Sequence, residues 1–325
     1  LMISVDLYLN ETTRHADVIL PVPSQLQRDH YDVLLLQFAI RNVANYSTPV
    51  LSLDDGQPDE WEILAKLGMI AQGLGPDADP HLADDLAIEG LVRNSIGDPS
   101  SPIHGRNADE IIDALNADGR RGPARMLDFM LQTGPYGAGF GTNSGGASLQ
   151  LLLDNPHGVD FGALESRLPD ALRTRTGMIE LAPEPLLADV PRLLDSIEEF
   201  TKNRFVLVGR RHLKTNNSWM HNIQVLVKGN VRCSLQMHTD DAKSLDLLSE
   251  SADEVFVSVT SRVGSVVVPV EITDDIRPGV VSLPHGWGHD HPGTKMRVAE
   301  SLSGVNSNIL SDHEAMDPLS GTSVL

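Results

Sequence analysis

The C-terminal third of the chain changes its hydrophobic period, and this change most restricts the folds open to the molecule. From about residue 204 onward, short apolar runs rich in β-branched residues are separated by Gly, Asn, Asp and Pro, a spacing typical of a small β-barrel or sandwich. One helix is expected among them, over 240–248 with Thr239 as its N-cap. The expected strands cover residues 205–208, 223–227, 231–235, 254–260 and 265–272.

The first 70 residues have the texture of an open α/β sheet. Two apolar runs, at 2–9 and 17–20, have the length of buried strands, and the polar stretch between them suits a short helical crossover. A helix is expected over 59–68, because acidic residues fill its first turn and Pro58 precedes it. The sequence thus predicts the remnant of an α/β, Rossmann-like domain ahead of the β-rich end.

Between these ends the pattern is helical and irregular. Residues 108–115 and 123–131 are predicted helices, and the glycine-dense stretch 135–146 is predicted to be a mobile surface loop. A dinucleotide fingerprint in that stretch is disfavoured, because no strand leads into it and no helix opens at its third glycine. We therefore expect three domains, namely 1–70 (α/β), 71–203 (a mostly helical insertion) and 204–325 (a β-barrel).

Charge and cysteine content exclude several classes of function. Asp and Glu outnumber Lys and Arg by 45 to 25, a formal charge of −20, which excludes a broad basic surface for nucleic acid or an anionic membrane. The single Cys233 excludes a disulfide framework, an all-cysteine zinc site and a four-cysteine iron–sulfur cluster carried by this chain alone. No apolar run approaches the ~18 residues of a membrane span. Because Leu1 is not an initiator methionine, we expect a fragment whose beginning is missing.

One loop stands out against the acidic background. Directly after the expected strand 205–208, residues 209–219 gather three cations with amide and hydroxyl groups. Glycine at a strand end lets backbone N–H groups approach a phosphate, and Arg can chelate it with two hydrogen bonds. The loop is either a phosphate site or a solvated charged turn. Its candidate groups are Arg210, Arg211, Lys214, Thr215, Asn216, Asn217 and Ser218.

A second loop, 284–292, carries three histidines. The spacing of His285, His289 and His291 could hold a metal, but no neighbouring Cys or Glu completes a zinc set. We expect instead a rigid loop that presents His285 and Trp287, with the other two histidines and the adjoining aspartate solvated.

Two aspartates remain open to several interpretations. Asp6 and Asp59 could form a general acid–base pair, although nothing in the sequence places them together. A carboxylate at a strand end can instead accept hydrogen bonds from a ribose or a purine edge. The structural alternatives are a turn aspartate for Asp6 and a helix N-terminal aspartate for Asp59.

Both ends of the chain carry short motifs in a particular order. Residues 5–21 contain Asn-Glu-Thr and end in Ala-Asp-Val-Ile-Leu-Pro. The later motifs are Val-Gly-Arg at 208–210, Asn-Ser-Trp at 217–219, His-Thr-Asp-Asp-Ala at 238–242, Pro-Gly-Val-Val-Ser-Leu-Pro at 278–284, Asn-Ile-Leu-Ser at 308–311 and Asp-Pro-Leu-Ser-Gly at 317–321. The ordered set resembles the molybdopterin oxidoreductases of the dimethyl sulfoxide reductase family, to which formate dehydrogenases and nitrate reductases belong.

This resemblance implies a fold and a cofactor. Residues 204–325 would form the family's molybdopterin-dinucleotide-binding domain, a double-psi β-barrel. The cofactor would be molybdenum bis(molybdopterin guanine dinucleotide), and the missing N-terminal part would supply the metal ligand and could carry an iron–sulfur cluster. Cys233 falls inside an expected barrel strand and is interpreted as a packed apolar residue.

The resemblance also implies roles for individual residues. Val5 and Asp6 match the strand end that holds guanosine, and residues 208–217 match the segment that wraps the pterin and pyrophosphate. Asp241 matches a family acid, but stabilisation of a helix N-terminus explains it. The implied cofactor-binding residues are Val5, Asp6, Arg28, Asp59, Val208, Gly209, Arg210, Asn216, Asn217, Ser218, His285 and Asn308.

The implied function is that of the C-terminal part of a molybdenum-dependent oxidoreductase. Its two end modules would grip the guanylated cofactor, for two-electron chemistry on a small substrate such as formate or nitrate. The alternative is a non-catalytic double-psi barrel module for protein docking or cofactor delivery. Expected partners are the small-molecule substrate, the missing N-terminal domains and an electron-transfer protein, with no nucleic acid and no membrane span. The expected compartment is the cytoplasm, and the chain alone, with no catalytic or metal residue assigned, should have no turnover.

Overall fold

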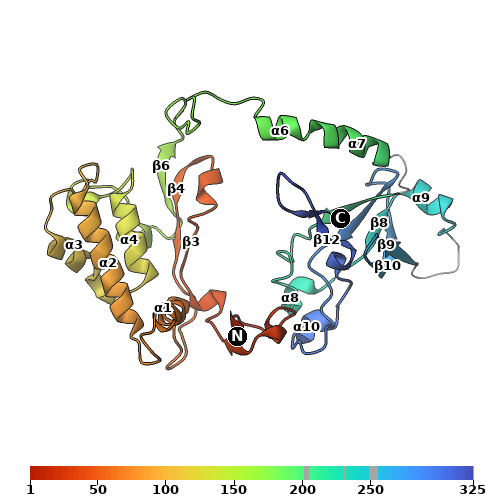
Figure 1. Cartoon of the computed structure of the whole chain (residues 1–325). Helices are drawn as coiled ribbons and strands as arrows, with labels where there is room; N and C mark the ends of the chain where they lie inside the picture. Colours follow the sequence, from red (N-terminus) through yellow and green to blue (C-terminus); the bar gives the residue numbers. More distant parts are fainter. Residues whose placement is uncertain (201–204, 230–231, 249–254, 325) are drawn as a thin grey trace. The chain divides into compact units, whose positions relative to one another are not determined.

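The computed structural model describes the chain except for residues 201–204, 230–231, 249–254 and 325 (Figure 1). The chain divides into two compact units that do not follow one another along the sequence. The helical unit comprises Ile3–Leu7 and Val18–Leu168, and the C-terminal unit comprises Leu1–Met2, Tyr8–Asp17 and Pro169–Leu325. The three domain boundaries drawn from the sequence stay a prediction.

Five helices and three small strand pairs make up the helical unit. The helices are α1 (Glu60–Ala71), α2 (Pro80–Gly97), α3 (Ala108–Leu115), α4 (Pro123–Thr133) and α5 (Leu149–Leu153). The pairs are β1 (Ile3–Val5) with β2 (Val18–Leu20), parallel, and two antiparallel pairs, β3 (His30–Tyr31) with β5 (Tyr46–Ser47) and β4 (Arg41–Ala44) with β6 (Val159–Ala163).

Polar caps begin these helices where the sequence places them. Asp59 and Glu62 form a capping box at the start of α1, and the side chain of Asn107 accepts a hydrogen bond from the Asp109 amide at the start of α3. The apolar face of α3 buries Ile111 and Leu115 completely. The core of this unit therefore forms between α2, α3 and α4.

The glycine-dense stretch 135–146 is only in part the surface loop expected of it. The Ala147 amide bonds the Tyr136 carbonyl at 2.6 Å, and the Arg106 guanidinium donates to the Gly139 carbonyl at 2.8 Å. A Cβ on Gly146 would lie 2.4 Å from the Gly137 oxygen. Gly137 and Gly146 thus serve close backbone packing, whereas residues 141–145 are exposed as a surface loop would be. The mobility of the stretch stays a prediction.

The C-terminal unit is built on one mixed sheet. Its strands are β7 (Val206–Arg210), β8 (Leu235–Met237), β9 (Phe256–Thr260), β10 (Ser265–Ile272) and β11 (Val280–Pro284), beside a hairpin of β12 (Asp312–Met316) and β13 (Ser323–Val324). Its helices are α6 (Glu184–Ala188), α7 (Val190–Phe200), α8 (Gln224–Val227), α9 (Thr239–Ser244) and α10 (Arg297–Glu300). The sheet order is β7-β11-β8-β10-β9.

The sheet is open in the described residues, whereas the sequence predicted a closed barrel. β7 and β9 are its edges, so no pairing among the described strands joins its two ends. β10 pairs antiparallel with β9 and parallel with β8. Apolar residues of β8, β10 and β11, with Trp287 and Leu310, form a buried core on this sheet.

Local predictions in this unit were partly wrong. The expected strand at 223–227 is the helix α8, because a short apolar run has no period that separates strand from helix. The expected strand at 231–235 is reduced to β8, with residue 231 outside the described residues. His238 rather than Thr239 caps α9, since its Nδ1 accepts the Asp240 amide at 3.0 Å.

Cys233 lies just before β8 and not within a strand. It is 7% exposed in the core of the sheet, and the Val305 amide donates to its Sγ at 3.4 Å. Burial raises the pKa of this thiol. The interpretation of Cys233 as a packed apolar residue agrees with this environment, whereas its assignment to a strand was wrong.

Asp241 provides a test of this sheet. Its carboxylate accepts the Gly279 amide at 2.7 Å and so ties α9 to the turn before β11. Asp241→Ala should lower the free energy of unfolding by about 1–2 kcal/mol, because it removes a hydrogen bond to a charged group. Asp240→Ala, at the exposed neighbour, should change it little. Hydrogen exchange of the β11 amides measures both, and equal effects would contradict this role.

Candidate functional site

Two loops of the C-terminal unit start from neighbouring strand ends. β7 and β11 are parallel and in register from Val206 opposite Val280 to Arg210 opposite Pro284. The chain therefore leaves both strands at their carboxyl ends, on the same end of the sheet. In α/β sheets, ligands bind outside the carboxyl ends of the strands. We call residues 211–223 the first loop and residues 285–291 the second loop; all predicted contacts from 208 to 285 lie on them or at the end of β7.

Arg210 binds within the protein. Its guanidinium donates to the carbonyls of Ser282 and Ser234, both at 2.8 Å, and Glu271 lies 4.0 Å away. Burial lowers the pKa of this guanidinium, and Glu271 acts against the shift. Arg210 thus joins β7 to β11 and to the residue before β8. Its contact with a phosphate stays a prediction.

His285 and Asn217 connect the two loops. The His285 Nδ1 lies 3.1 Å from the Arg210 carbonyl, and its Nε2 lies 2.9 Å from the Asn217 side-chain oxygen. Asn216 and Asn217 have φ values of +42° and +62°, a left-handed conformation that Asn tolerates better than most residues. Three residues implied by the family resemblance are therefore together in one hydrogen-bonded cluster.

Two glycines of the second loop allow close backbone contacts. Gly286 has a φ of +83°, and a Cβ there would lie 2.8 Å from the Asn217 oxygen. Gly288 has a φ of +100°, and its Cβ would lie 2.6 Å from the Asn306 Cβ. The Asn306 side chain in turn accepts the Asn308 amide at 2.9 Å. Asn308, which is exposed, therefore lies two residues from a segment in direct contact with the second loop.

The donor set of these loops fits a polar, anionic ligand. Among the described residues, Nδ1 of His212 and Nε1 of Trp287 are buried and have no hydrogen-bond partner. The two rings lie edge to face, with centroids 6.0 Å apart. Arg211 and Lys214 are exposed on the first loop. A bound group with several acceptor atoms would satisfy the buried nitrogens and offset the cations.

The second loop differs from its prediction in two residues. Trp287 was expected to be presented and His289 to be solvated, but they are only 5% and 3% exposed. Trp287 packs on His221, with centroids 4.3 Å apart, and His289 is bonded on both ring nitrogens. The loop sequence alone does not show these partners, because they come from distant segments.

In the helical unit, two further predicted residues meet in one cavity. Arg28 and Asp59 both line a cavity of about 590 Å³ at the start of α1, together with Trp61. Arg28 forms an ion pair with Glu60. Val5 and Asp6, at the end of β1, do not line this cavity.

The carboxyl of Asp59 sits in an unfavourable environment for a charge. Burial raises its pKa, the neighbouring carboxylates of Asp29 and Glu62 add to the shift, and Arg28 opposes it. The Asp29 carboxylate also accepts a hydrogen bond from Tyr46, whose pKa is raised by burial and by this bond. Asp59 is the N-cap of α1, so its structural interpretation holds, and a ligand that donates to it would be favoured as well.

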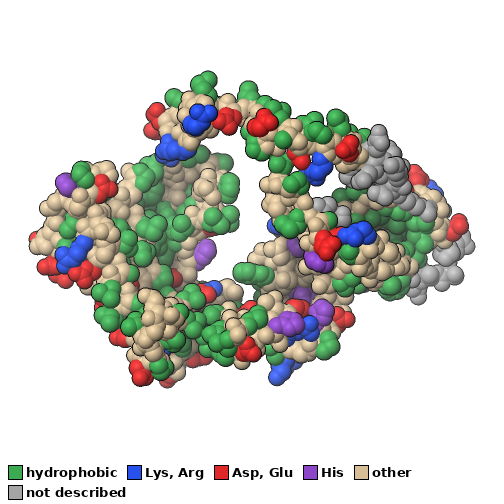
Figure 2. Space-filling view, in the orientation of Figure 1, with side chains coloured by type: hydrophobic (Ala, Val, Ile, Leu, Met, Phe, Trp, Pro, Cys, Tyr) green, Lys and Arg blue, Asp and Glu red, His purple; other side chains and the backbone are tan. Residues whose placement is uncertain are grey.

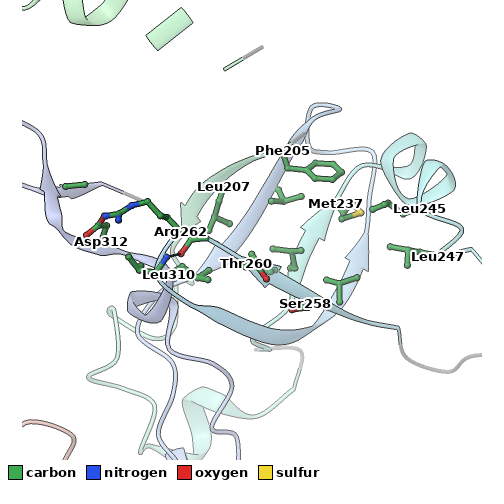
Figure 3. A pocket seen from close by; sticks show the side chains of 17 residues that line it. Phe205, Leu207, Met237, Leu245, Leu247, Ser258, Thr260, Arg262, Leu310 and Asp312 are labelled. Carbon is green, nitrogen blue, oxygen red and sulfur yellow. Dashed lines mark hydrogen bonds and ion pairs between the residues drawn. The ribbon is translucent and has the colours of Figure 1, made fainter. Parts of the chain in front are cut away.

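A second cavity, of about 920 Å³, lies on the sheet of the C-terminal unit (Figure 3). Arg262 and Asp312 form an ion pair at one end, and Leu245 and Leu247 lie at the other. Its walls are mostly core residues of the strands, and no residue predicted to bind cofactor lines it. This cavity is therefore part of the sheet's interior rather than a candidate polar site.

Comparisons with known proteins match the part of the chain that contains both loops. Residues 205–325 match the family described as the Molydopterin dinucleotide binding domain. A search of curated proteins finds no match. Among solved structures, the chain is similar to acetylene hydratase from Pelobacter acetylenicus, with 20% identity, a TM-score of 0.49, and coverage of 99% of this chain and 38% of that one. The chain thus spans 38% of the length of that enzyme.

The part of the chain that carries the open sheet and both loops, residues 205–325, is thus similar to a molybdopterin dinucleotide-binding domain. This confirms the resemblance that the sequence motifs indicate. No helix in the described parts of the chain has the length and apolar character needed to cross a bilayer. No cluster of three or more potential metal ligands occurs among the described residues.

The bonds of Arg210 lead to a prediction about stability. Arg210→Ala should lower the free energy of unfolding of the C-terminal unit by about 1.5–3 kcal/mol, because two buried carbonyls lose a charged donor. Urea unfolding of cofactor-free protein measures this, with Arg211→Ala, at the exposed neighbour, as the control. A residue that bound only phosphate would leave the cofactor-free stability unchanged.

Asp59 allows a test by pH. Because the folded-state pKa of Asp59 is raised above the ordinary value of an aspartate carboxyl, its contribution to stability is present at low pH and is lost as the pH rises through the folded pKa. Asp59→Asn keeps a capping oxygen and should remove this loss, whereas Asp59→Ala removes the cap as well and should be about 1 kcal/mol less stable than Asp59→Asn at all pH values. Hydrogen exchange of the α1 amides between pH 4 and 7 follows both variants. Parallel pH profiles for wild type and Asp59→Asn would contradict the assignment.

Proposed function

We propose that the chain belongs to a molybdenum-dependent oxidoreductase and binds its molybdopterin guanine dinucleotide. The single observation that carries the proposal is the match of residues 205–325 to a molybdopterin dinucleotide-binding domain. Within that range, the two loops contain buried nitrogens that lack hydrogen-bond partners, which supports a binding role for them. The proposed substrate is a small molecule such as formate or nitrate, and the proposed form of the cofactor is the bis(guanine dinucleotide). When bound, this group would supply two-electron redox chemistry at its metal.

Each part of the first loop would have a separate task. Arg211 and Lys214, which are both exposed, would attract the pyrophosphate, while Asn216, Asn217 and Ser218 would donate or accept hydrogen bonds. Backbone N–H groups at Val208 and Gly209 would add donors at the end of β7, where a Cβ on Gly209 meets no atom within 4 Å. Arg210, held by two carbonyls, would fix the start of this loop.

The second loop and the residues after it would contribute ring and amide contacts. His285 is anchored by its Nδ1 and turned toward Asn217, so its ring has one orientation. The buried nitrogens of His212 and Trp287 would bond to acceptor atoms of the bound group. Asn308 would offer its exposed amide.

The helical unit would contribute contacts to the nucleoside. A guanine edge carries two kinds of N–H donor, and donation to the crowded carboxyl of Asp59 would offset the penalty that burial and the neighbouring carboxylates place on its charge. Trp61 lines the same cavity and offers a ring for stacking. Val5, Asp6 and Arg28 are proposed contacts by family resemblance. The double-psi barrel is likewise part of the proposal, and the apolar sheet face around the 920 Å³ cavity supports it.

A second candidate function rests on a different observation. Helices α6 and α7 expose a stripe of large apolar side chains. Figure 2 shows green side chains along both helices, with acidic and basic ones between them. The stripe consists of Leu186, Leu187, Val190, Leu193, Leu194 and Ile197. Spacings of three and four residues place these side chains on one helix face, which suits a protein-docking module.

Analysis of the cofactor content separates the two functions. Protein purified from a host that makes the cofactor should contain guanine nucleotide, released by acid, in about one or two equivalents per chain, with molybdenum if the metal-bound form is retained. Arg211→Ala should retain about tenfold less nucleotide, because it loses a charged hydrogen bond. Arg277→Ala makes the same charge change at another exposed site and should retain the wild-type amount. Protein without guanine nucleotide would overturn the proposal and favour the docking module.

A further inference from the structure

Three side chains from distant segments form one hydrogen-bonded chain in the C-terminal unit. Oε1 of Glu11 lies 2.9 Å from Nδ1 of His289, and Nε2 of His289 lies 2.7 Å from Nδ1 of His221. His221 and His289 are 1% and 3% exposed, whereas the side chain of Glu11 is 32% exposed. The hydrogen-bonded chain from Glu11 to His221 therefore leads from the surface into the interior of the contact between the two loops.

The chemistry of the groups sets the direction of the hydrogen bonds. A carboxylate can only accept, so the Nδ1 of His289 that faces Glu11 carries a proton. With that proton on Nδ1, His289 can accept at Nε2 a hydrogen bond that His221 donates from its own Nδ1. Burial lowers the pKa of His221 to about 4, and the neighbouring His289 adds to the shift, so His221 is neutral near pH 7. Both hydrogen bonds point toward Glu11.

The hydrogen-bonded chain connects the first loop with the second loop. His221 ends the first loop region and His289 lies in the second loop, so their bond closes one side of the loop pair. The close contact of Gly286 with the Asn217 backbone and the bond from His285 to Asn217 close the other side. The His221 ring also packs on Trp287, tilted by 40°.

Glu11 connects this hydrogen-bonded chain to a third segment of the polypeptide, outside the two loops. The segment Tyr8–Asp17 belongs to the C-terminal unit and makes two other bonds to residues just beyond the second loop. The Lys295 amide donates to the Leu9 carbonyl at 2.7 Å, and the Arg14 guanidinium donates to the Pro292 carbonyl at 2.8 Å. The position of Glu11 relative to His289 is thus defined by backbone contacts on both sides.

We infer that Glu11, His289 and His221 are positioning residues that set the spacing of the two loops, and through it the orientation of His285 and Trp287 toward the bound dinucleotide. The inference rests on the proposed function for its ligand and on the hydrogen-bonded chain for its mechanism. Ring packing alone would keep the loops in contact, but it would not transmit a change at Glu11 to the first loop. The hydrogen bonds from Glu11 through His289 to His221 would transmit such a change.

The test uses two single variants and their combination in the full chain. Glu11→Ala leaves the His289 Nδ1–H without an acceptor, and His289→Phe keeps a ring of similar shape but removes both bonds. Each should raise amide hydrogen exchange in residues 211–223 and 285–291 about tenfold, the effect of one hydrogen bond to a charged group. Each should also retain about tenfold less guanine nucleotide. The double variant should be no worse than His289→Phe, because both act through one chain.

Asp290→Ala is the matched control, since it removes an exposed carboxylate next to His289 without touching the chain. It should leave exchange and nucleotide content unchanged. Faster exchange in the second loop only, or additive effects in the double variant, would overturn the inference. If His289→Phe does not fold, Glu11→Ala with His221→Gln gives the same cycle from its two ends. Wild type lacking guanine nucleotide would refute the proposed function, while the exchange results would still decide the positioning role.

A pH profile separates this role from simple packing. The titratable groups that face His221 are His289, His212 and Glu11. Because the folded pKa of His221 lies below that of the unfolded chain, protonation favours the opened loops as the pH falls from about 6.5 to about 4. Exchange in both loops should rise over that interval in wild type and stay level in His221→Gln, after correction for intrinsic exchange. An identical rise in both proteins would contradict the inference.

Discussion

Parallel pairing of β7 with β11 is the constraint on which the C-terminal unit depends. The register opposes Arg210 to Pro284, so two chain segments more than sixty residues apart turn away from the sheet at the same edge. Every polar contact in the loop pair follows from that alignment. Arg210 stabilises this strand pairing, because its guanidinium donates hydrogen bonds to the carbonyl of Ser282 on β11 and to that of Ser234 before β8.

The loop pair combines rigid and unsatisfied elements. His285, Asn217 and Gly286 define a fixed backbone arrangement through short contacts, whereas the buried nitrogens of His212 and Trp287 have no partner among the described residues. Such nitrogens are costly in a closed interior and useful where a polar ligand completes them. The helical unit shows the same principle at Asp59, whose carboxyl is crowded by Asp29 and Glu62 and relieved only by Arg28.

Local signals in the sequence were sufficient for some elements. α3 has the predicted bounds because Asn107 caps it and its apolar residues repeat with the helical period. β10 also has the predicted bounds, since its long run of Val contains no helix former. The run at 223–227 was misassigned because it is too short to show a period, and the Asn222 side chain that precedes it caps α10 from a distance.

Non-local pairing was beyond the sequence. The first loop was recognised from its cations and amides, and the family motifs added His285 and Asn308. Nothing near His289 indicated that Glu11 and His221 would be its partners, because they lie 278 and 68 residues away. The glycines of 135–146 were likewise taken to indicate a mobile loop, although Gly137 and Gly146 are required by close backbone approach. Packing of distant segments decided each of these cases.

The segment Tyr8–Asp17 has a bearing on how such proteins diverge. It is inserted between two strands of the helical unit, yet it folds with the C-terminal unit. An exchange of residues 205–325 between related genes would therefore transplant His289 without Glu11 and leave an acceptor from one parent facing a donor from another. Recombination at residue 205 would therefore separate these hydrogen-bond partners unless residues 8–17 were exchanged as well. We expect residues 8–17 and 205–325 to be inherited together.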